Sequence, residues 1–212
     1  MTSALELYEA ALDAPDGLRV RFDDGSLAPL PVSRYVAAAD PLDRRVLAGL
    51  EGPVLDVGCG PGRHLHALAG AGIFALGVDI SPAAVALARR GGGRAVVADV
   101  FGRVPAAGRW ASALLLDGNI GIGGAPARLL ARLGELVMPG GAILVEVEAP
   151  GRESTSRLAR IEVEERVSGW FAWARVSAAE IGTLAGCVNL SVEEIWSCQN
   201  RWFARLRGAP AA

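Results

Sequence analysis

Short runs of apolar residues alternate with stretches of helical spacing from Pro53 to about residue 149. Each apolar run ends in turn residues, and this alternation predicts a parallel β-sheet whose strands are joined by crossover helices. The runs are nearly all apolar, as is typical of strands that are covered on both faces. The predicted strands are residues 54–57, 74–78, 94–98, 111–116 and 142–147.

Capping residues mark the helices between these strands. Ser81 can cap a helix whose first position is Pro82. Pro126 opens another helix, and the Pro-Gly-Gly sequence at 139–141 ends it. The residues that start and end these helices therefore agree with the predicted strands.

Beyond residue 149 the alternation fails. Two β-rich stretches, residues 161–167 and 170–176, follow each other around Ser168 and Gly169. They are interpreted as a hairpin, because a serine-glycine pair between two such stretches is a turn signal.

The last part of the chain predicts a helix and two more strands. Ser177 and Glu180 have the spacing of a capping box for a helix to about residue 186. Strands at 188–196 and 201–206 follow. The predicted fold class is therefore α/β, with a doubly wound, mostly parallel sheet of seven strands that ends in an antiparallel hairpin.

Residues 1–50 form a predicted leader that packs as a cap on the domain of residues 51–212. Neither the leader nor the hairpin before residue 177 is needed to complete the central sheet, so both are candidate lids over a cleft. Asp40 and Asp43 fit the cap and first turn of a helix, and their carboxylates are interpreted as structural. The expected leader elements are a helix near residues 3–12, strands at 18–22 and 27–30, and a second helix that begins at Asp40.

The chain has 212 residues, of which 51% are hydrophobic and 21% are charged. This length and balance predict a globular protein. No apolar run approaches the roughly 18 residues that a membrane helix needs, and the first ten residues carry glutamates where a signal peptide carries basic residues. We therefore expect a soluble, cytoplasmic protein that does not bind a membrane.

Charge and residue usage disfavour several kinds of chemistry. The formal net charge is -2, so no global basic field gathers phosphates, and nucleic acid is a poor candidate for a partner. All 21 basic residues are arginine, which excludes mechanisms that need a Schiff-base or P-loop lysine. Three widely spaced cysteines and two histidines indicate neither a disulfide framework nor a metal site.

The strongest chemical signal is the sequence VLDVGCGPG at residues 54–62, where a predicted strand meets a helix. Gly58, Gly60 and Gly62 let the backbone turn tightly and approach a ligand closely. The helix that follows presents unpaired N–H groups and the positive end of its dipole. A ligand that carries a carboxylate fits this junction.

Four carboxylates are expected at the carboxyl ends of four successive strands. Asp56 belongs to the first strand, and Asp79 ends the second, where a nucleotide-binding fold hydrogen-bonds two ribose hydroxyls. Asp99 and Asp117 end the third and fourth strands. Open α/β sheets bind their ligands along this edge, so the four side chains indicate one shared site.

These motifs resemble the class I SAM-dependent methyltransferases, and the resemblance covers the chain from about Pro53 to its C-terminus. The sequence DVGCGPG at residues 56–62 is similar to that family's glycine-rich first motif almost letter for letter. The resemblance implies S-adenosyl-L-methionine (SAM) as the cofactor and S-adenosylhomocysteine (SAH) as its product. The implied cofactor-binding residues are Asp56, Gly58, Cys59, Gly60, Gly62, Asp79, Ile80, Asp99, Val100 and Asp117.

By the same resemblance, the glycine loop lies under the methionine part of SAM, and Asp79 accepts hydrogen bonds from both ribose hydroxyls. Ile80 would pack on the adenine, Asp99 would accept from its exocyclic amine, and the Val100 N–H would point at the ring. The implied activity is methyl transfer from SAM to a small molecule, with an oxygen, nitrogen, carbon or sulfur atom as the acceptor.

Two other functions share part of this pattern. An NAD-dependent oxidoreductase uses the same strand-turn-helix junction, but Arg63 stands where its fingerprint has a third glycine. A regulatory protein that binds SAM without transferring the methyl group fits the same motifs. A methyl-transfer assay separates that alternative from an enzyme.

Three residues are candidates for catalysis. His64 lies in the first helical turn beside the glycine loop and could act as a base, although packing or capping would also explain it. Asp117 and Asn119 belong to the glycine-rich loop at 117–124 and could hold the methionine amino group or the acceptor. The alternative is a loop that only caps its own backbone.

The leader and the predicted hairpin supply the candidates for acceptor binding. Arg34 could pair with a carboxylate of the cofactor or acceptor. Tyr35, Trp170, Phe171 and Trp173 could form an aromatic pocket, although aromatic residues in strands are more often core. Three arginines at odd-numbered positions are expected on one face of the last strand: Arg201, Arg205 and Arg207. They are interpreted as a charged sheet edge that discourages aggregation.

Overall fold

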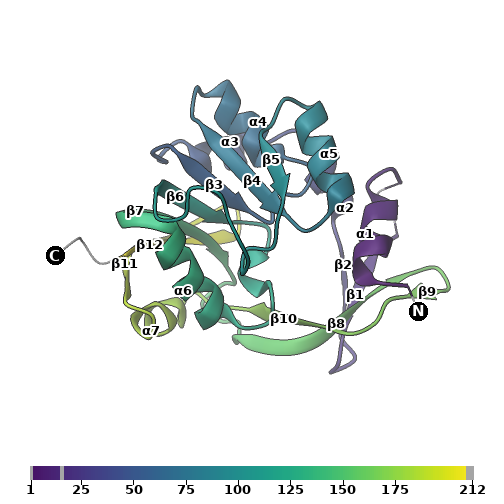
Figure 1. Ribbon diagram of the computed structural model, residues 1–212. Helices are drawn as coiled ribbons and strands as arrows, with labels where there is room; N and C mark the ends of the chain where they lie inside the picture. Colours follow the sequence, from purple (N-terminus) through teal and green to yellow (C-terminus); the bar gives the residue numbers. More distant parts are fainter. Residues whose placement is uncertain (1, 15–16, 209–212) are drawn as a thin grey trace.

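The computed structural model describes residues 2–14 and 17–208. A central sheet carries helices on both faces, and a second, antiparallel sheet lies beside it (Figure 1). The central strands follow the order β11-β12-β7-β6-β3-β4-β5. They are β3 (Val54–Val57), β4 (Ala75–Asp79), β5 (Ala95–Val97), β6 (Trp110–Leu115), β7 (Val137–Val147), β11 (Leu190–Cys198) and β12 (Arg201–Gly208).

The direction of the strands confirms the predicted fold class. The neighbouring pairs from β7 to β5 are parallel, whereas β12 is antiparallel to both β7 and β11. The largest difference in a boundary of the central sheet is at β7, which already begins at Val137 and includes the Pro-Gly-Gly sequence, with Gly140 at a φ of +72°. The preceding helix still ends just before it, at Leu136.

Helices cover both faces of the central sheet, because side chains alternate between the two faces along each strand. Val54 packs with the helices of one face, and the adjacent Leu55 packs with those of the other. The first face is covered by α3 (Pro41–Leu47), α4 (Arg63–Gly70) and α5 (Pro82–Arg90). The second is covered by α6 (Pro126–Leu136) and α7 (Ile181–Gly186).

The predicted helix caps are mostly present. Ser81 accepts a hydrogen bond from the Ala84 N–H at 3.0 Å, and Asp40 forms a full capping box with Asp43. The capping box predicted at Ser177 is wrong, since α7 begins only at Ile181. Ser177 instead forms a bridge to Glu148, just after β7. It is therefore still paired as in a strand, and the helix begins only after it.

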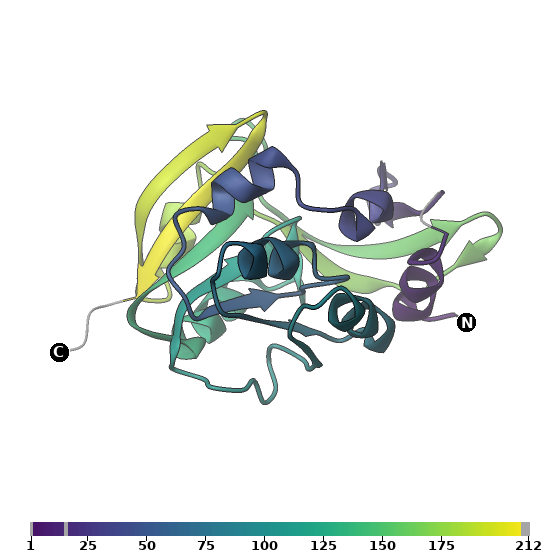
Figure 2. The ribbon, with the colours of Figure 1, turned by 90° about the horizontal axis from the view of Figure 1, so that it is seen from above.

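The second sheet combines segments from distant parts of the chain. Its main order is β10-β8-β1-β2, and β9 pairs with β8. The antiparallel pairing of β1 with β8 therefore joins the leader to the predicted late hairpin, which the sequence did not indicate. Figure 2 shows these strands reaching from the central sheet toward the N-terminal helix. They are β1 (Arg19–Phe22), β2 (Leu27–Pro29), β8 (Thr155–Val163), β9 (Arg166–Val167) and β10 (Phe171–Arg175).

The predicted turn of the late hairpin at Ser168 and Gly169 is only partly correct. The tight turn lies earlier, between β8 and β9, with Glu164 at a φ of +52°. After β9, the chain passes Ser168, whose hydroxyl accepts from the Ile161 N–H, and β10 then pairs with the first half of β8. The short β9 continues the β-rich pattern of residues 161–167, so the pattern concealed the turn within it.

Two leader helices complete the fold. Helix α1 (Ala4–Ala11), which is capped by Ser3, packs through Leu7 against the second sheet and α5. Helix α2 (Val32–Val36), which the sequence did not predict, places Val32 in the same core. Among the described residues, no helix has both the length and the apolar character needed to span a membrane.

Candidate functional site

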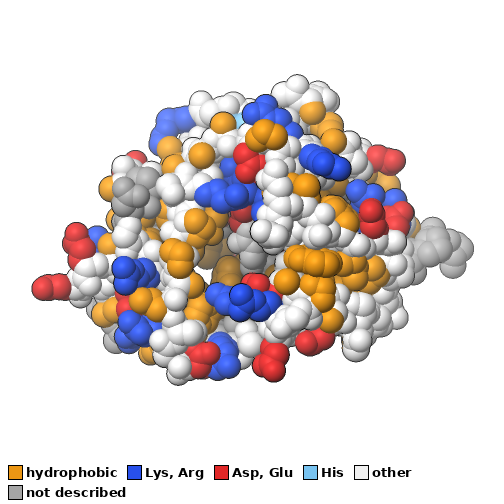
Figure 3. Space-filling model, turned by 180° about the vertical axis from the view of Figure 1, so that it is seen from behind, with side chains coloured by type: hydrophobic (Ala, Val, Ile, Leu, Met, Phe, Trp, Pro, Cys, Tyr) orange, Lys and Arg blue, Asp and Glu red, His pale blue; other side chains and the backbone are white. Residues whose placement is uncertain are grey.

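A cavity of about 1040 Å³ lies between the carboxyl ends of the central strands, the leader and the second sheet. Seen from behind, the surface is hollowed near its centre, with hydrophobic and charged side chains around the opening (Figure 3). Pockets for single drug-sized ligands have roughly 300 to 1,000 Å³. The cavity is therefore large enough for a cofactor together with a second molecule.

The glycine loop between β3 and α4 forms part of the cavity wall. A Cβ on Gly58 would lie 2.7 Å from Asn119 Nδ2, and one on Gly62 would lie 2.7 Å from the Ala88 Cβ. Gly62 therefore allows α4 to pack on α5 and does not line the cavity, whereas Gly58 does. A Cβ on Gly60 would come within 3.3 Å of the Tyr8 hydroxyl, so a glycine keeps this narrow part of the cavity open.

Asp79 lies at the end of β4 and lines the cavity beside this loop. Its Oδ2 accepts from the Gly60 N–H at 2.8 Å, and its Oδ1 accepts from the Ser81 N–H at 2.8 Å. Burial raises its pKa, while these backbone donors lower it. Each carboxylate oxygen keeps capacity for a further hydrogen bond, so the side chain can hold the loop and still bind ligand hydroxyls.

Three residues of the predicted adenine site also line the cavity: Ile80, Asp99 and Val100. Ile80 is 58% exposed, although it is a large apolar side chain. Asp99 Oδ1 accepts from the Phe101 N–H at 2.9 Å, and Arg132 donates to the Val100 carbonyl at 2.9 Å. The loop after β5 is thus fixed at both its acidic residue and its backbone, with an apolar side chain exposed beside it.

Asp56 is buried below the loop and does not line the cavity. Burial, together with the nearby carboxylates of Asp117 and Asp79, raises its pKa to about 7. Its Oδ2 has no hydrogen-bond partner among the described residues. A direct contact between Asp56 and the cofactor therefore stays a prediction that the cavity lining does not support.

His64 contributes to the cavity lining, but its ring is almost completely buried. Its Nε2 lies 3.8 Å from Asp117 Oδ2 and makes no hydrogen bond to the described residues. Burial lowers its pKa to about 4, so the ring is neutral near pH 7. His66 is placed differently, because its Nε2 lies 3.0 Å from the Ala88 carbonyl and the residue does not line the cavity.

A cluster of ion pairs occupies the floor of the site. Arg63 pairs with both Asp43 and Asp117. Arg201 makes two contacts of 2.7 Å with Glu146 and one of 2.9 Å with Asp43. Arg34 adds a hydrogen bond of 3.0 Å to Asp43 and lies 3.6 Å from Asp117. The cluster joins the leader to α4, β7 and β12.

This cluster corrects two interpretations of the sequence. Arg201 does not form a charged edge, because β12 lies inside the sheet and the guanidinium binds Glu146 in the site. Asp43 does form a capping box, but the same carboxylate also binds arginines from distant parts of the chain. The strand of Arg201 and the helix position of Asp43 were predicted correctly. Their ion-pair partners were missed because these lie far away in sequence.

Two residues that were predicted to bind the cofactor or the acceptor make structural contacts within the protein. Asn119 Nδ2 donates to the carbonyls of Val57 and Gly58, at 2.9 Å each, so its amide fastens the loop after β6 to the glycine loop. The Cys59 side chain is buried, and burial raises the pKa of its thiol. A Cβ on Gly77 would come within 2.4 Å of Cys59 Sγ, so this thiol packs against β4.

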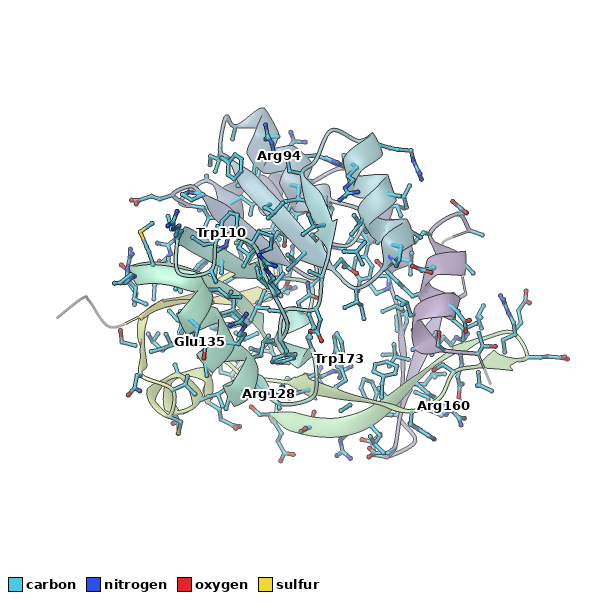
Figure 4. The ribbon with its side chains drawn as sticks, in the orientation of Figure 1. Arg94, Trp110, Arg128, Glu135, Arg160 and Trp173 are labelled. Carbon is cyan, nitrogen blue, oxygen red and sulfur yellow. The ribbon has the colours of Figure 1, made fainter. Side chains whose placement is uncertain are left out.

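On the acceptor side, the cavity lining includes Arg34, Tyr35 and Trp173 but not Trp170. Trp170 is 46% exposed, and the Arg160 guanidinium lies 4.9 Å from the centre of its ring. Figure 4 shows Trp173 where β10 meets the loop after β6, and a bridge between Ile122 and Trp173 joins the two segments.

Several cavity residues were missed by the sequence analysis. Tyr8 of α1 has its hydroxyl beside Gly60, and its spacing of three from Leu5, which also lines the cavity, was the available signal. Burial raises the pKa of both Tyr8 and Tyr35, so both hydroxyls are protonated donors. Phe22 and Arg175 line the cavity from the second sheet. They could not be assigned to the site from the sequence, because the second sheet was not predicted.

The comparisons with known proteins agree with this geometry. Residues 54–141 match a family model described as a methyltransferase domain. A search of curated proteins found no match to the chain. A SAM-dependent methyltransferase from Bacteroides fragilis, solved in complex with SAH, has 22% identity and a TM-score of 0.81; the alignment covers 99% of this chain and 97% of that one.

Two further solved structures are more distant. A 1,6-didemethyltoxoflavin-N1-methyltransferase from Burkholderia thailandensis, solved with its substrate and SAH, has 21% identity and a TM-score of 0.63, with 84% of this chain and 81% of that one covered. An amino pentose methyltransferase from Micromonospora echinaspora, solved with SAM, has 17% identity and a TM-score of 0.58, with 78% and 88% covered. Residues 54–141 are thus similar to a methyltransferase domain, and the chain shares its fold with solved SAM-dependent methyltransferases.

Proposed function

We propose that this protein transfers a methyl group from SAM to a small-molecule acceptor. The observation that carries the proposal is the single cavity that extends from the glycine loop and Asp79 to the inner face of the second sheet. One end offers the turn and the carboxylate expected of a nucleoside site, and the other offers an apolar wall. The structural relatives that act on small molecules give further support.

The residues at the cofactor end have distinct tasks in this proposal. Asp79 binds the ribose hydroxyls, while its hydrogen bond to Gly60 keeps the loop in place. Asp99 and Ile80 form the adenine end. SAM supplies a methyl group on a positively charged sulfur, which a nucleophile can attack without a metal or a covalent enzyme intermediate. The principal task of the chain is then to hold the acceptor in line with that methyl group.

The geometry makes a strong general base unnecessary to the proposal. Asp117 is paired with arginines, and the Nε2 of His64 is buried, although the residue contributes to the cavity lining. The positive charges of Arg34, Arg63 and Arg201 are offset locally by the carboxylates of Asp43, Asp117 and Glu146, which they contact. These groups therefore shape the floor, and the proton of the acceptor leaves with solvent.

Ligand binding and methyl transfer test the proposal in turn. Thermal shift with SAM, SAH and NAD identifies the cofactor, because a ligand at about 100 times its dissociation constant adds roughly 2.7 kcal/mol to the stability. Stabilisation by NAD alone would contradict the assignment. Incubation of metabolite extracts with labelled SAM then locates the methylated product, and binding of SAM without any transfer would favour the regulatory alternative.

A further inference from the structure

One wall of the cavity is formed by the second sheet, and its side chains follow from the strand register. Phe22 of β1 and Phe171 of β10 both pair with Ala159 of β8. Side chains at paired positions point to the same face of a sheet. The two phenyl groups therefore lie on either side of a small residue, and both line the cavity.

Strand β10 extends this surface. Phe171, Trp173 and Arg175 alternate along the strand, so they share a face, and all three line the cavity. The rings of Phe171 and Trp173 meet edge to face, with 6.2 Å between their centres. We call Phe22, Phe171 and Trp173 the aromatic wall. Flat apolar groups pack well against such rings.

Arg175 stands at the end of the aromatic wall. Its guanidinium lies 4.6 Å from the centre of the Phe22 ring. Its Nε is 3.9 Å from Glu148 Oε1, which is beyond hydrogen-bond distance, and both side chains are more than 40% exposed. The guanidinium is thus positioned by a ring but keeps its hydrogen-bond donors available.

The other arginines of the cavity differ in this respect. Arg34, Arg63 and Arg201 are held by hydrogen bonds to the carboxylates of the floor. Arg152 lines the cavity near Glu148 in sequence and forms no ion pair within residues 2–14 and 17–208. Arg152 and Arg175 thus add two positive charges to the cavity lining, against one carboxylate at Glu148, and this balance favours an anionic group.

We propose that the methyl acceptor is a flat aromatic acid, whose ring packs on the aromatic wall and whose carboxylate binds Arg175. This inference rests on the proposed methyltransferase function. A guanidinium matches a carboxylate with two parallel hydrogen bonds, and its contact with Phe22 holds the plane of that group in advance. The acid displaces the loose contact of Arg175 with Glu148 and brings the aromatic ring over Phe171 and Trp173.

The test uses 4-hydroxybenzoate and its methyl ester as matched probes, which differ in charge but hardly in ring shape. SAH binding is measured first by calorimetry. Each probe is then titrated into the SAH-saturated protein, and the change in tryptophan fluorescence is followed in the wild type and in Trp173→Phe, which identifies the contribution of Trp173. We expect the acid to bind at least about fivefold more tightly than the ester, as for a partly exposed ion pair.

The variants assign this preference to one side chain. Arg175→Gln should reduce the affinity for the acid to that for the ester and leave SAH affinity unchanged. Arg157→Gln is the matched control, because Arg157 pairs in register with Trp173 on β8, contacts Asp23 and Asp24, and does not line the cavity. It should keep the acid preference, and melting curves confirm that both variants are folded.

The outcomes separate the two proposals. If SAH does not bind the wild-type protein, the proposed function fails, and the acceptor class fails with it. If SAH binds but the ester binds as well as the acid, or neither probe binds, only the acceptor class is overturned. An acid preference that survives in Arg175→Gln also overturns it.

Discussion

The Gly60 N–H donates a hydrogen bond of 2.8 Å to Asp79 Oδ2. This contact fastens the glycine loop after β3 to the end of β4, so two sequence motifs form one structural unit. Asp79 therefore has a structural task in addition to the proposed binding of ribose hydroxyls. The two tasks can be separated because stability and ligand affinity are measured independently.

For Asp79→Ala we expect SAH affinity to fall by at least about tenfold, because charge-assisted hydrogen bonds to two hydroxyls are lost. Asp79→Asn should lie between the wild type and the alanine variant, since it keeps one acceptor oxygen. Calorimetric titration with SAH, beside melting curves, measures both effects. Asp24→Ala is the control, because Asp24 also accepts from a backbone N–H two residues later, at Ser26, but lies outside the cavity lining. Unchanged SAH affinity in a folded Asp79→Ala protein would remove Asp79 from the cofactor site.

Two arginines of β12 should differ sharply in their contribution to stability. Arg201→Gln leaves Glu146 without its ion-pair partner and removes one of the arginines that bind the buried Asp43, and we expect a loss of about 3 kcal/mol in the free energy of unfolding. Arg205→Gln is the matched change on the same strand face, and it should cost less than about 1 kcal/mol, since its contact with the exposed Glu194 is 3.9 Å long. Chemical denaturation measures both values, and similar losses would argue against the floor cluster as a stabilising unit.

The buried carboxylate of Asp56 should make stability depend on pH. Burial raises its pKa from 3.8 to about 7, so the folded state holds this proton more tightly than the unfolded state. The associated stability is complete below about pH 4 and is lost as the pH rises through about 7. Asp56→Asn removes this loss, so its free energy of unfolding relative to the wild type should rise by at least about 1 kcal/mol from pH 4 to pH 8.

Denaturation of Asp56→Asn and the wild type at several pH values checks this prediction. His64 acts in the opposite direction in the same range, because its lowered pKa of about 4 weakens the folded state as the pH falls below 6.5. Both proteins retain His64, so the difference between them isolates the carboxylate. A constant difference from pH 4 to pH 8 would show that Asp56 is not held in its protonated form.

The leader and the second sheet should become less mobile when the cofactor binds, as expected of a lid. Hydrogen exchange with and without SAH should show slower exchange in the second sheet and in α1, which carries Tyr8 beside the glycine loop. Helix α6 is the internal control, because it packs on the central sheet through fully buried leucines. Equal protection in both states would show that these segments do not close over the ligand.

The parts of the site that were predicted from the sequence depend on short-range signals. The glycine loop, its strand and its helix lie within a few residues of one another, and the cap at Ser81 sits directly after Asp79. Their geometry is dictated by backbone conformations that only a few residue types adopt easily. The central sheet was predicted for the same reason, because each strand-turn-helix unit carries its own pattern.

The remaining parts depend on contacts between distant segments. Arg201 was assigned to the correct strand, but its partner Glu146 lies 55 residues away on β7. The pairing of β1 with β8 leaves no trace in either strand, since both show an ordinary alternation. Trp173 and Trp170 were equally plausible as pocket residues, but Trp170 lies just before β10 and only Trp173 lines the cavity.

This pairing also sets the order in which the protein can fold during its synthesis. Arg21 and Glu162, which meet across β1 and β8, are 141 positions apart, so β1 leaves the ribosome long before its partner. Contacts of such long range form late, because the chain must first close a large loop. The glycine loop and its neighbouring strands can assemble earlier from local contacts. The surface proposed to select the acceptor is therefore completed last, after the part that would bind the cofactor.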